Sequence, residues 1–317
     1  MKTIKQIALG VLVLAVGFTT GCQRHSKKEV FYLISVNTAL PYWQTAAAGF
    51  KHAGDAYKVT TQVVGPDGYD PQAEKAEFEK AVAAKPAGIL VSVADAGLLA
   101  PEIDSAVSAG IPVVTVDSDA PDSHRLFFIG TNNLEAGRIG ARRVIEKLGG
   151  TGTVVFFTLA GQPNMEERLK GFKDIFESRP NIKIGDVIDV KGDVHTAFDK
   201  TQELVLLTGP KKVDAFVCLD STSGKMVSDA LKRTNTTDRL LVVWDVSQDT
   251  LDGIKAGTID STVTQKPYVM GYFGLQAVDQ AFHSPSKGLY PAFVDTGTSL
   301  VERHNVDQYS VQPTGGQ

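Results

Sequence analysis

From residue 30 onward, short apolar runs alternate with longer amphipathic segments. This pattern predicts a strand over residues 30–36, a helix over 42–57 and a second strand over 59–64. Apolar runs of strand length separated by helix-length segments are typical of βαβ units built around a mostly parallel sheet. The fold class that follows is α/β.

The same alternation continues through the first half of the chain. Asp70 offers a side-chain cap and Pro71 a favourable first position for a helix that runs to residue 84. Gly110 is expected to end the helix that follows in the sequence, at residues 101–109. The remaining predicted elements of this half are a strand at residues 88–93, a helix at 101–109 and a strand at 112–117.

The pattern then starts again, which indicates two similar halves. A strand over 153–158 precedes a helix over 165–178, as the first strand precedes the first helix. Two later strands, 213–220 and 240–245, match 87–93 and 111–117. The join lies at Gly130, Thr131 and Asn132, where a glycine tolerates unusual backbone angles and Asn132 or Asn133 can cap a helix that runs to residue 148. We expect a hinge there.

The first 22 residues have the features of a secretion signal. Lys2 and Lys5 precede an apolar run of 12 residues, and at about 1.5 Å per residue such a run is too short to span a bilayer. The segment Thr-Thr-Gly-Cys at 19–22 resembles a bacterial lipobox, which would place lipid on Cys22. Thr19 departs from the preferred leucine, so ordinary signal cleavage stays open. We expect residues 23–29 to be a tether and 311–317 a flexible tail.

Composition narrows the function classes. With 317 residues the chain is long enough for two domains, and a net charge of −4 gives no basic surface for nucleic acid. We find no Walker loop, no G-x-G-x-x-G after a strand, and no catalytic Ser-His-Asp or Cys-His grouping of familiar spacing. The six histidines show no metal-ligand spacing, so neither a metal site nor a cofactor is expected. Cys218 lies in an apolar run and is predicted to be a buried core residue.

Polar residues gather where predicted strands end. In open α/β sheets, ligands bind beyond the carboxyl ends of the strands. A carboxylate there can accept hydrogen bonds from two adjacent hydroxyls of a neutral polyol, and a flat ring can stack on a sugar. Each aspartate could instead cap a helix, and each ring could belong to the core. The candidate residues are Asn37, Tyr42, Trp43, Asp117, Asp119, Asp220, Asp245 and Gln265.

These segments resemble the ribose-binding-like periplasmic proteins, whose fold is shared with LacI-type repressors. The resemblance covers residues 30–309 and is carried by the order and spacing of SVNTALPYWQTAAAGF, KPAGILVSVAD, AGIPVVTVDSD, IGTNNLEAGRIGA, ERLKGF, VWDVSQDTLDGIKAGTIDSTVTQKPYVMG and VDTGTSLVERHNVDQY. It implies a type I periplasmic binding protein with two doubly wound, parallel-sheet lobes joined by a three-segment hinge. The lobes would be residues 30–131 plus 266–297 and residues 132–265 plus 298–310.

The resemblance also assigns roles. It aligns Tyr42 and Trp43 with the family's two stacking aromatic residues, and Asp117 and Asp245 with its sugar-binding aspartates. Arg168 aligns with the arginine before a Gly-Phe pair, and Gln265 with the glutamine at the last crossover. Asn37 aligns only loosely. Ser118 and Asp220 depart from the family, because ribose binders carry arginine and usually asparagine there. The ligand is therefore left open among pentoses, hexoses and cyclitols.

The function implied is that of an exported solute-binding protein. It would be a monomer in the periplasm or at the cell surface, attached to the membrane only through Cys22, and would deliver its sugar to an ABC permease of the inner membrane. Two alternatives remain: the closed protein could dock on a chemoreceptor or sensor kinase, or two aspartates could serve a glycoside-processing enzyme. A repressor would need a helix-turn-helix domain where the signal stands.

Overall fold

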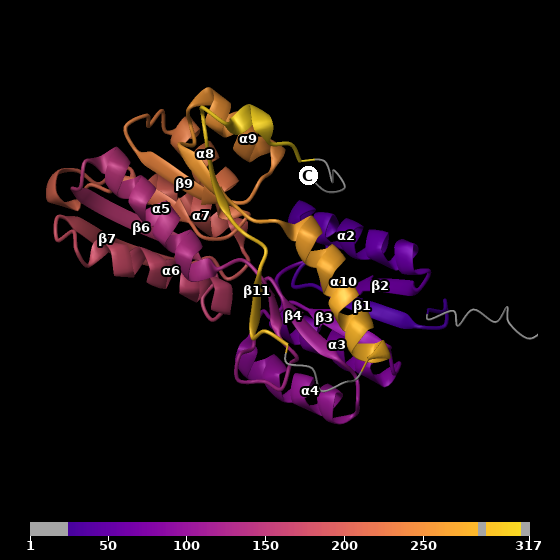
Figure 1. The fold of residues 1–317 in the computed structure, drawn as a ribbon. Coiled ribbons are helices and arrows are strands. Elements are labelled where there is room, and N and C mark those ends of the chain that lie inside the picture. Colours follow the sequence, from indigo (N-terminus) through magenta and orange to yellow (C-terminus); the bar gives the residue numbers. More distant parts are fainter. Residues whose placement is uncertain (1–24, 285–289, 312–317) are drawn as a thin grey trace, which may run out of the picture.

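The computed structural model describes residues 25–284 and 290–311, which form two α/β lobes (Figure 1). The predicted signal, Cys22 and the lipobox, the start of the tether and residues 312–317 of the predicted tail lie outside the described residues. None of the described helices is both long and apolar enough to cross a bilayer.

The first lobe is built on a six-stranded sheet in which all paired strands are parallel. Its central strands are buried on both faces, as expected of a parallel sheet covered by helices on each side. From one edge to the other the strands are β11 (Phe293–Asp295), β5 (Phe128–Gly130), β4 (Val113–Val116), β3 (Gly88–Val91), β1 (Val30–Ile34) and β2 (Thr60–Val64).

The second lobe repeats this arrangement. The pairs are parallel except at one edge, where β12 runs antiparallel to β10. The equivalent order of the two sheets confirms the repeated α/β pattern predicted from the sequence. The strands are β12 (Ser299–Glu302), β10 (Ser261–Thr264), β9 (Leu240–Trp244), β8 (Ala215–Cys218), β6 (Gly152–Thr158) and β7 (Ile182–Asp189).

Helices cover both faces of each sheet and enclose four apolar clusters. In the first lobe α2 (Pro41–Tyr57) and α10 (Pro267–His283) share one face, and α3 (Pro71–Ala83) and α4 (Ala96–Ser108) the other. In the second lobe α5 (Asn133–Leu148) and α6 (Pro163–Phe176) cover one face, and α7 (Val194–Leu204), α8 (Ser223–Arg233) and α9 (Gln248–Ala256) cover the other. The lobe also has two short 3₁₀ turns, η1 (Gly209–Lys211) and η2 (Val306–Gln308).

The described chain passes between the lobes at three places: after β5, after β10, and between β11 and β12. Two of these crossovers are joined, because the backbone N–H of Thr296 donates to the carbonyl of Gly130 at 2.7 Å. Asn132 caps α5 through the N–H of Glu135, as one of the two predicted alternatives required. Gly130 does not have a left-handed φ; instead, a Cβ there would lie 2.4 Å from the Phe128 ring. The glycine at position 130 is therefore explained by the lack of room for a Cβ beside the Phe128 ring and not by its backbone angle.

Glycines bring one pair of helices into close contact in each lobe. A Cβ at Gly271 of α10 would lie 1.9 Å from the carbonyl oxygen of Ala46 in α2. In the second lobe a Cβ at Gly137 of α5 would lie 2.1 Å from the carbonyl oxygen of Arg168 in α6. Any side chain at these positions would force the helices apart. The second contact fixes the backbone that carries Arg168.

Two predicted elements needed correction. The helix expected at 101–109 begins at Ala96, because Asp95 caps it through the N–H of Leu98. Pro101 is tolerated inside it, since the carbonyl that loses a helical donor belongs to Gly97, which is exposed to water. The helix expected from residue 165 begins at Pro163. The cap at Asp70 is as predicted, accepting from Gln72 and Ala73.

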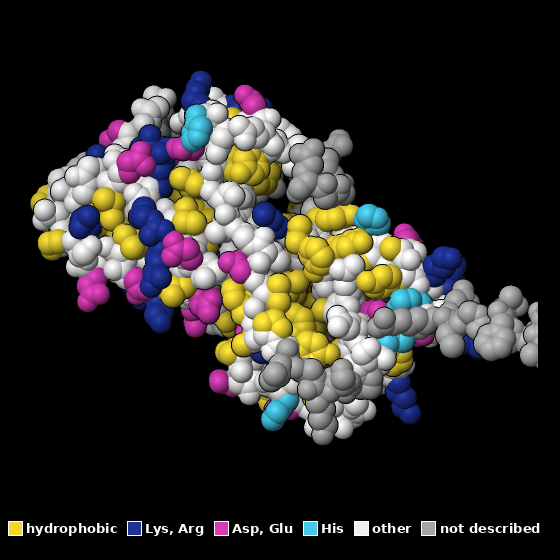
Figure 2. Space-filling model, viewed as in Figure 1, with side chains coloured by type: hydrophobic (Ala, Val, Ile, Leu, Met, Phe, Trp, Pro, Cys, Tyr) yellow, Lys and Arg dark blue, Asp and Glu magenta, His cyan; other side chains and the backbone are white. Residues whose placement is uncertain are grey.

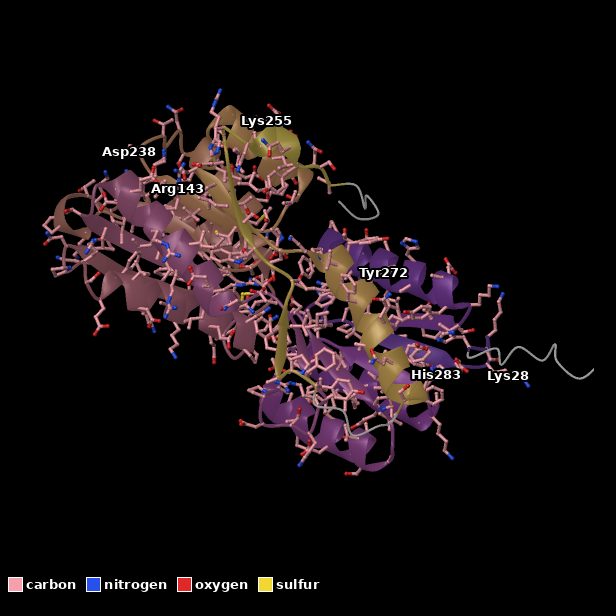
Figure 3. All side chains as sticks on the ribbon, viewed as in Figure 1. Lys28, Arg143, Asp238, Lys255, Tyr272 and His283 are labelled. Carbon is pink, nitrogen blue, oxygen red and sulfur yellow. The ribbon has the colours of Figure 1, made fainter. Side chains whose placement is uncertain are left out.

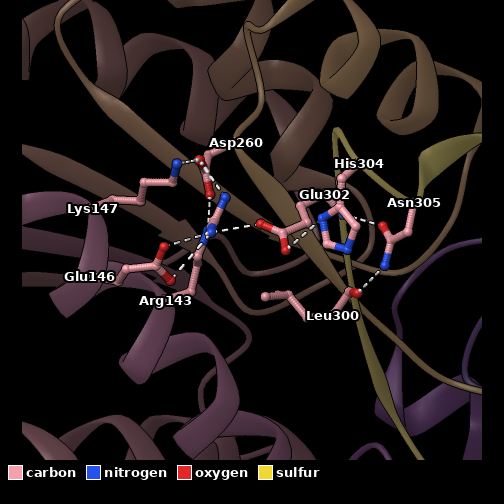
Figure 4. Close-up of polar contacts among 8 residues, drawn as sticks. All are labelled: Arg143, Glu146, Lys147, Asp260, Leu300, Glu302, His304 and Asn305. Atoms are coloured by element: carbon pink, nitrogen blue, oxygen red, sulfur yellow. Dashed lines mark hydrogen bonds and ion pairs between the residues drawn. The ribbon is translucent and has the colours of Figure 1, made fainter.

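Arg143 fastens the returning C-terminal strand to the second lobe (Figure 4). Its guanidinium is largely buried and lies 2.6 Å from Oδ2 of Asp260 and 2.6 Å from Oε2 of Glu302 on β12. Because β12 follows the third crossover, these ion pairs anchor one end of the hinge.

The two lobes differ in the face seen in Figure 2. Apolar side chains gather over the lobe that contains α2 and α10, while charged side chains are more frequent over α5 and α6. The exposed large apolar residues of α10 and β11 are Phe273, Phe282 and Phe293.

Candidate ligand-binding site

A cavity of about 290 Å³ lies between the lobes, at the carboxyl ends of the strands. This is the position at which open α/β sheets bind ligands. The structure brings eight of the nine predicted binding residues to its wall: Asn37, Tyr42, Trp43, Asp117, Arg168, Asp220, Asp245 and Gln265.

Asp117 and Asp245 occupy equivalent places in the two lobes. Asp117 follows β4 and Asp245 follows β9, and both have left-handed backbone angles, with φ of 64° and 66°. Non-glycine residues rarely adopt this conformation, which costs of order 1 kcal/mol or more and is found preferentially at functional sites. The turn re-aims each carboxylate toward the cavity at the end of its strand.

Asp117 is buried and both of its carboxylate oxygens accept hydrogen bonds. The hydroxyl of Tyr42 donates to Oδ1 at 2.6 Å, and the amide of Asn164 donates to Oδ2 at 3.1 Å. Burial raises the pKa of Asp117, while the Arg168 guanidinium and the Tyr42 hydroxyl oppose that rise. Burial and the Asp117 carboxylate also raise the pKa of Tyr42 well above its ordinary value, so this phenol remains a hydrogen-bond donor.

Asp245 accepts a hydrogen bond of 2.9 Å from the amide of Gln265, at the second crossover. Burial raises its pKa to about 6, against the opposing effects of Arg168 and of the Gln265 bond. The neighbouring carboxylates of Asp117 and Asp220 add to the rise. The bond from Gln265 ties the orientation of this carboxylate to a hinge residue.

Arg168 is the cation of the site and is almost completely buried. Its Nη1 donates to the carbonyl of Leu219 at 2.6 Å, and its Nε donates to Oδ1 of Asn133 at 2.9 Å. The guanidinium also lies over the Trp244 ring, 5.4 Å from its centre. Nη2 has no hydrogen-bond partner. A rigidly held guanidinium with a free donor at the cavity wall is suited to a hydroxyl oxygen of a ligand.

Asp220 also lines the cavity, but its carboxylate is engaged by the start of α8. Oδ1 accepts from the N–H groups of Thr222 and Ser223, and Oδ2 accepts from the Ser223 hydroxyl at 2.5 Å. Of the two interpretations open from the sequence, helix cap and ligand contact, this geometry favours the cap. Any contact with ligand would have to share oxygens that already have donors.

Asp119 was predicted to bind ligand, but the structure does not bring it to the cavity wall. Its carboxylate forms a two-point ion pair with Arg125 and accepts from the Thr115 hydroxyl at 2.6 Å. Two positions after Asp117, the chain has already turned away toward the loop before β5. Asp119 is therefore a structural residue of that loop.

Aromatic rings cover part of the wall. Tyr42 and Trp43 at the start of α2 lie edge to face, 5.3 Å apart, and Trp43 is buried. Tyr69, which sequence reasoning missed, lines the same cavity and reaches the carbonyl of Ala94 with its hydroxyl at 3.3 Å. The signal that could have found it is its place after the second strand, directly before the Asp70 cap.

Two polar residues were missed because the start of α6 was placed too late. Gln162 ends the loop after β6 and Asn164 lies in the first turn of α6, on either side of Pro163, and both line the cavity. Gln162 Oε1, Asn164 Oδ1 and Gln265 Oε1 are buried and lack hydrogen-bond partners. Together with Asp117, Asp245 and Arg168 they offer both acceptors and donors to a ligand enclosed between the lobes.

Known proteins share this fold. A family model described as periplasmic binding protein domain matches residues 31–283. The ribose import binding protein of Bacillus subtilis is 25% identical over 267 residues, covering 81% of this chain and 83% of that protein.

Solved structures agree. The sugar-binding protein of a sugar ABC transporter from Bacillus halodurans is 33% identical, with a TM-score of 0.80 over 89% of this chain and 100% of that one. The arabinose-binding protein AraP from Geobacillus stearothermophilus is 31% identical, with a TM-score of 0.74 over 89% and 99%. The chain thus belongs to the periplasmic binding protein family, among its ribose-binding-like members with the type I fold.

Proposed function

We propose that this protein captures a neutral monosaccharide or related polyol by closing its lobes around it. The observation that carries the proposal is the pair of buried aspartates, Asp117 and Asp245, which reach one cavity from equivalent strand ends of opposite lobes. A ligand held by both would join the lobes and favour the closed form over the open one.

The charge of the cavity supports a neutral ligand. Three carboxylates, Asp117, Asp220 and Asp245, face a single guanidinium, Arg168. An acidic sugar would bring a further anion into this buried space and be repelled. Sugar hydroxyls satisfy both kinds of group, because each can donate to a carboxylate and accept from Arg168. The volume of about 290 Å³ suits a single small sugar better than an oligosaccharide.

We infer that the captured sugar is delivered to an ABC permease, with the protein acting as a monomer outside the cytoplasm. The support comes from relatives, whose names include a ribose import binding protein and the binding protein of a sugar ABC transporter. Lipid attachment at Cys22 belongs to the same proposal, since it would keep the protein beside such a permease.

A binding role accounts for the aspartates better than catalysis does. Both oxygens of Asp117 accept hydrogen bonds from Tyr42 and Asn164, which orient the carboxylate and leave further lone pairs to accept from ligand hydroxyls. Incubation with candidate glycosides should therefore give no turnover.

A thermal-shift screen across pentoses, hexoses, cyclitols and the corresponding sugar acids tests the proposal. At least one neutral compound should raise the melting temperature, and the shift should be lost in Asp245→Ala. Isothermal titration then gives the affinity and a stoichiometry of one. If only sugar acids bind, or if no member of these classes does, the proposed ligand class is wrong.

A further inference from the structure

A second group of ligand-type side chains lies far from the cavity, where the start of the described chain meets the end of α10. Nε2 of His25 is 3.0 Å from Oδ2 of Asp279, and Nδ1 of His283 is 3.1 Å from Oδ1 of the same carboxylate. One ligand atom from each residue lies within 4.8 Å of the others. Figure 3 labels His283 at the end of α10 that faces the start of the described chain, near Lys28.

The helix and a neighbouring ring hold these side chains in place. Asp279 and His283 are four residues apart on α10, so they project from the same face one turn apart. The ring of His25 stacks on Tyr57 of α2, with centres 4.8 Å apart and planes 3° from parallel. The cluster therefore has little freedom to rearrange.

The polar atoms of the cluster are buried without full hydrogen bonding. Oδ1 of Asp279, whose side chain is only 5% exposed, has no hydrogen-bond partner, and neither has Nε2 of His283. Oε2 of Glu29 is also without one and lies 3.4 Å from Nε2 of His283. A buried carboxylate oxygen without a hydrogen bond is costly, and a cation between these atoms would remove the cost.

The spacing of the atoms suits one ion. Zn²⁺ binds imidazole nitrogen and carboxylate oxygen at about 2.0–2.1 Å, so neighbouring ligand atoms of a tetrahedral site lie about 3.3 Å apart. The contacts of 3.0 Å between Nε2 of His25 and Oδ2 of Asp279, and of 3.4 Å between Nε2 of His283 and Oε2 of Glu29, are close to that value. Nδ1 of His283 can donate to the carbonyl of Asp279 at 3.0 Å, which leaves Nε2 as the metal-binding nitrogen.

We propose that His25, Asp279 and His283 form a binding site for one divalent transition-metal ion, with Glu29 beside Nε2 of His283 and with Zn²⁺ the ion that fits the ligand set best. The ion would link positions 254 residues apart and fix the segment that follows the predicted tether to α10. Sequence spacing gave no sign of such a site because its ligands come from the two ends of the chain.

The test is titration of Zn²⁺ into the full chain, purified without a polyhistidine tag and freed of metal with EDTA. We expect one ion per chain, and Co²⁺ in the same site should give the visible absorption of a tetrahedral complex. His25→Gln and His283→Gln should each weaken Zn²⁺ binding at least a hundredfold, since even the loss of outer partners of metal ligands costs about 10–100-fold.

His124→Gln is the matched control, because His124 pairs with Asp104 at 3.0 Å in the same lobe but has no second histidine beside it. It should bind Zn²⁺ like the wild type. Zn²⁺ at about a hundred times its Kd should raise the melting temperature of wild type and His124→Gln by roughly 3–6 °C, and that of His25→Gln by much less.

No saturable one-to-one uptake by the wild type would refute the site, as would wild-type affinity in His25→Gln and His283→Gln. Should His283→Gln fail to fold, His25→Gln decides the matter, since residue 25 lies outside every helix and strand. Sugar binding provides an independent check on folding, because the cavity lies elsewhere and should be unaffected by these changes.

Discussion

The side-chain amide of Asn164 donates a hydrogen bond of 3.1 Å to the carboxylate of Asp117, and this bond connects the two lobes. Asp117 follows β4 in the first sheet, and Asn164 lies at the start of α6 in the second lobe. The two lobes also pack closely where Gly192 of the second lobe meets Tyr69 of the first, since a Cβ at Gly192 would lie 2.9 Å from the side chain of Tyr69. The two lobes are thus in direct contact.

We predict that the sugar shifts the population from an open to a closed form with these contacts. The radius of gyration from small-angle scattering should fall when ligand is added to saturation. Asn164→Ala should weaken binding by about 2–10-fold, because it removes one hydrogen bond of the closed state. Asn181→Ala, an exposed asparagine of the same lobe, is the control. An unchanged radius at saturation would contradict hinge closure.

Asp245 and Arg168 should carry much of the binding energy. Hydrogen bonds to charged groups contribute roughly 1.5–3 kcal/mol, so Asp245→Ala and Arg168→Ala should each weaken the sugar about 10–100-fold. Isothermal titration measures this. Asp104→Ala should leave affinity unchanged, because Asp104 is on α4 and contacts His124 away from the cavity.

Unfolding curves must accompany these titrations. Arg168→Ala leaves the Leu219 carbonyl and Asn133 without their donor, and a stability loss of about 1–3 kcal/mol is expected from buried groups left unpaired. If both variants fold and bind like the wild type, Asp245 and Arg168 do not hold the ligand.

Asp220 offers a test of helix cap against ligand contact. Asp220→Ala should lower the free energy of unfolding by about 0.5–2 kcal/mol through loss of the α8 cap, while sugar affinity changes less than in Asp245→Ala. Asp95→Ala removes a comparable cap from α4, outside the cavity, and should lower stability without touching affinity. A loss of affinity in Asp220→Ala as large as that in Asp245→Ala would assign Asp220 to the ligand instead.

The features that the sequence predicted are those that depend on the local apolar pattern and on the rule that parallel sheets bind ligands at the carboxyl ends of their strands. Buried strands such as β3 and β4 are almost entirely apolar, so their ends, and with them Asp117, could be located. The exposed edge strand β7 has no such pattern and was not predicted. Asp245 was found for the same reason as Asp117, at the matching strand of the repeat.

The remaining features depend on partners that only the fold brings together. The residues around Asp119 in the sequence do not show that Arg125 forms an ion pair with it, although the two are only six residues apart. The contact between Asn164 and Asp117 spans 47 residues and two lobes. Whether Asp220 caps α8 or faces ligand depends on side-chain orientation, which the residue type leaves undecided.

The last prediction concerns pH. Burial raises the pKa of Asp245 to about 6, and hydroxyls that donate to its carboxylate favour the ionised form, so ligand binding should lower this pKa. Affinity should then be constant well above pH 6 and fall as the pH drops through 6, because a proton taken up by the free protein must leave on binding. At pH 5 about nine-tenths of the free protein is protonated at Asp245, which limits the loss to roughly tenfold.

Stability of the ligand-free protein should change in the opposite direction. With a folded pKa of about 6 and an unfolded pKa near 3.9, the folded state binds more protons between these values, so this group makes folding more favourable as the pH falls from 7 to 5. Titrations and melting curves at pH 5, 6 and 7.5 measure both effects. Asp245→Asn should bind more weakly and lose most of the pH dependence of affinity; a wild-type affinity that is flat across this range would show that Asp245 does not accept from the sugar.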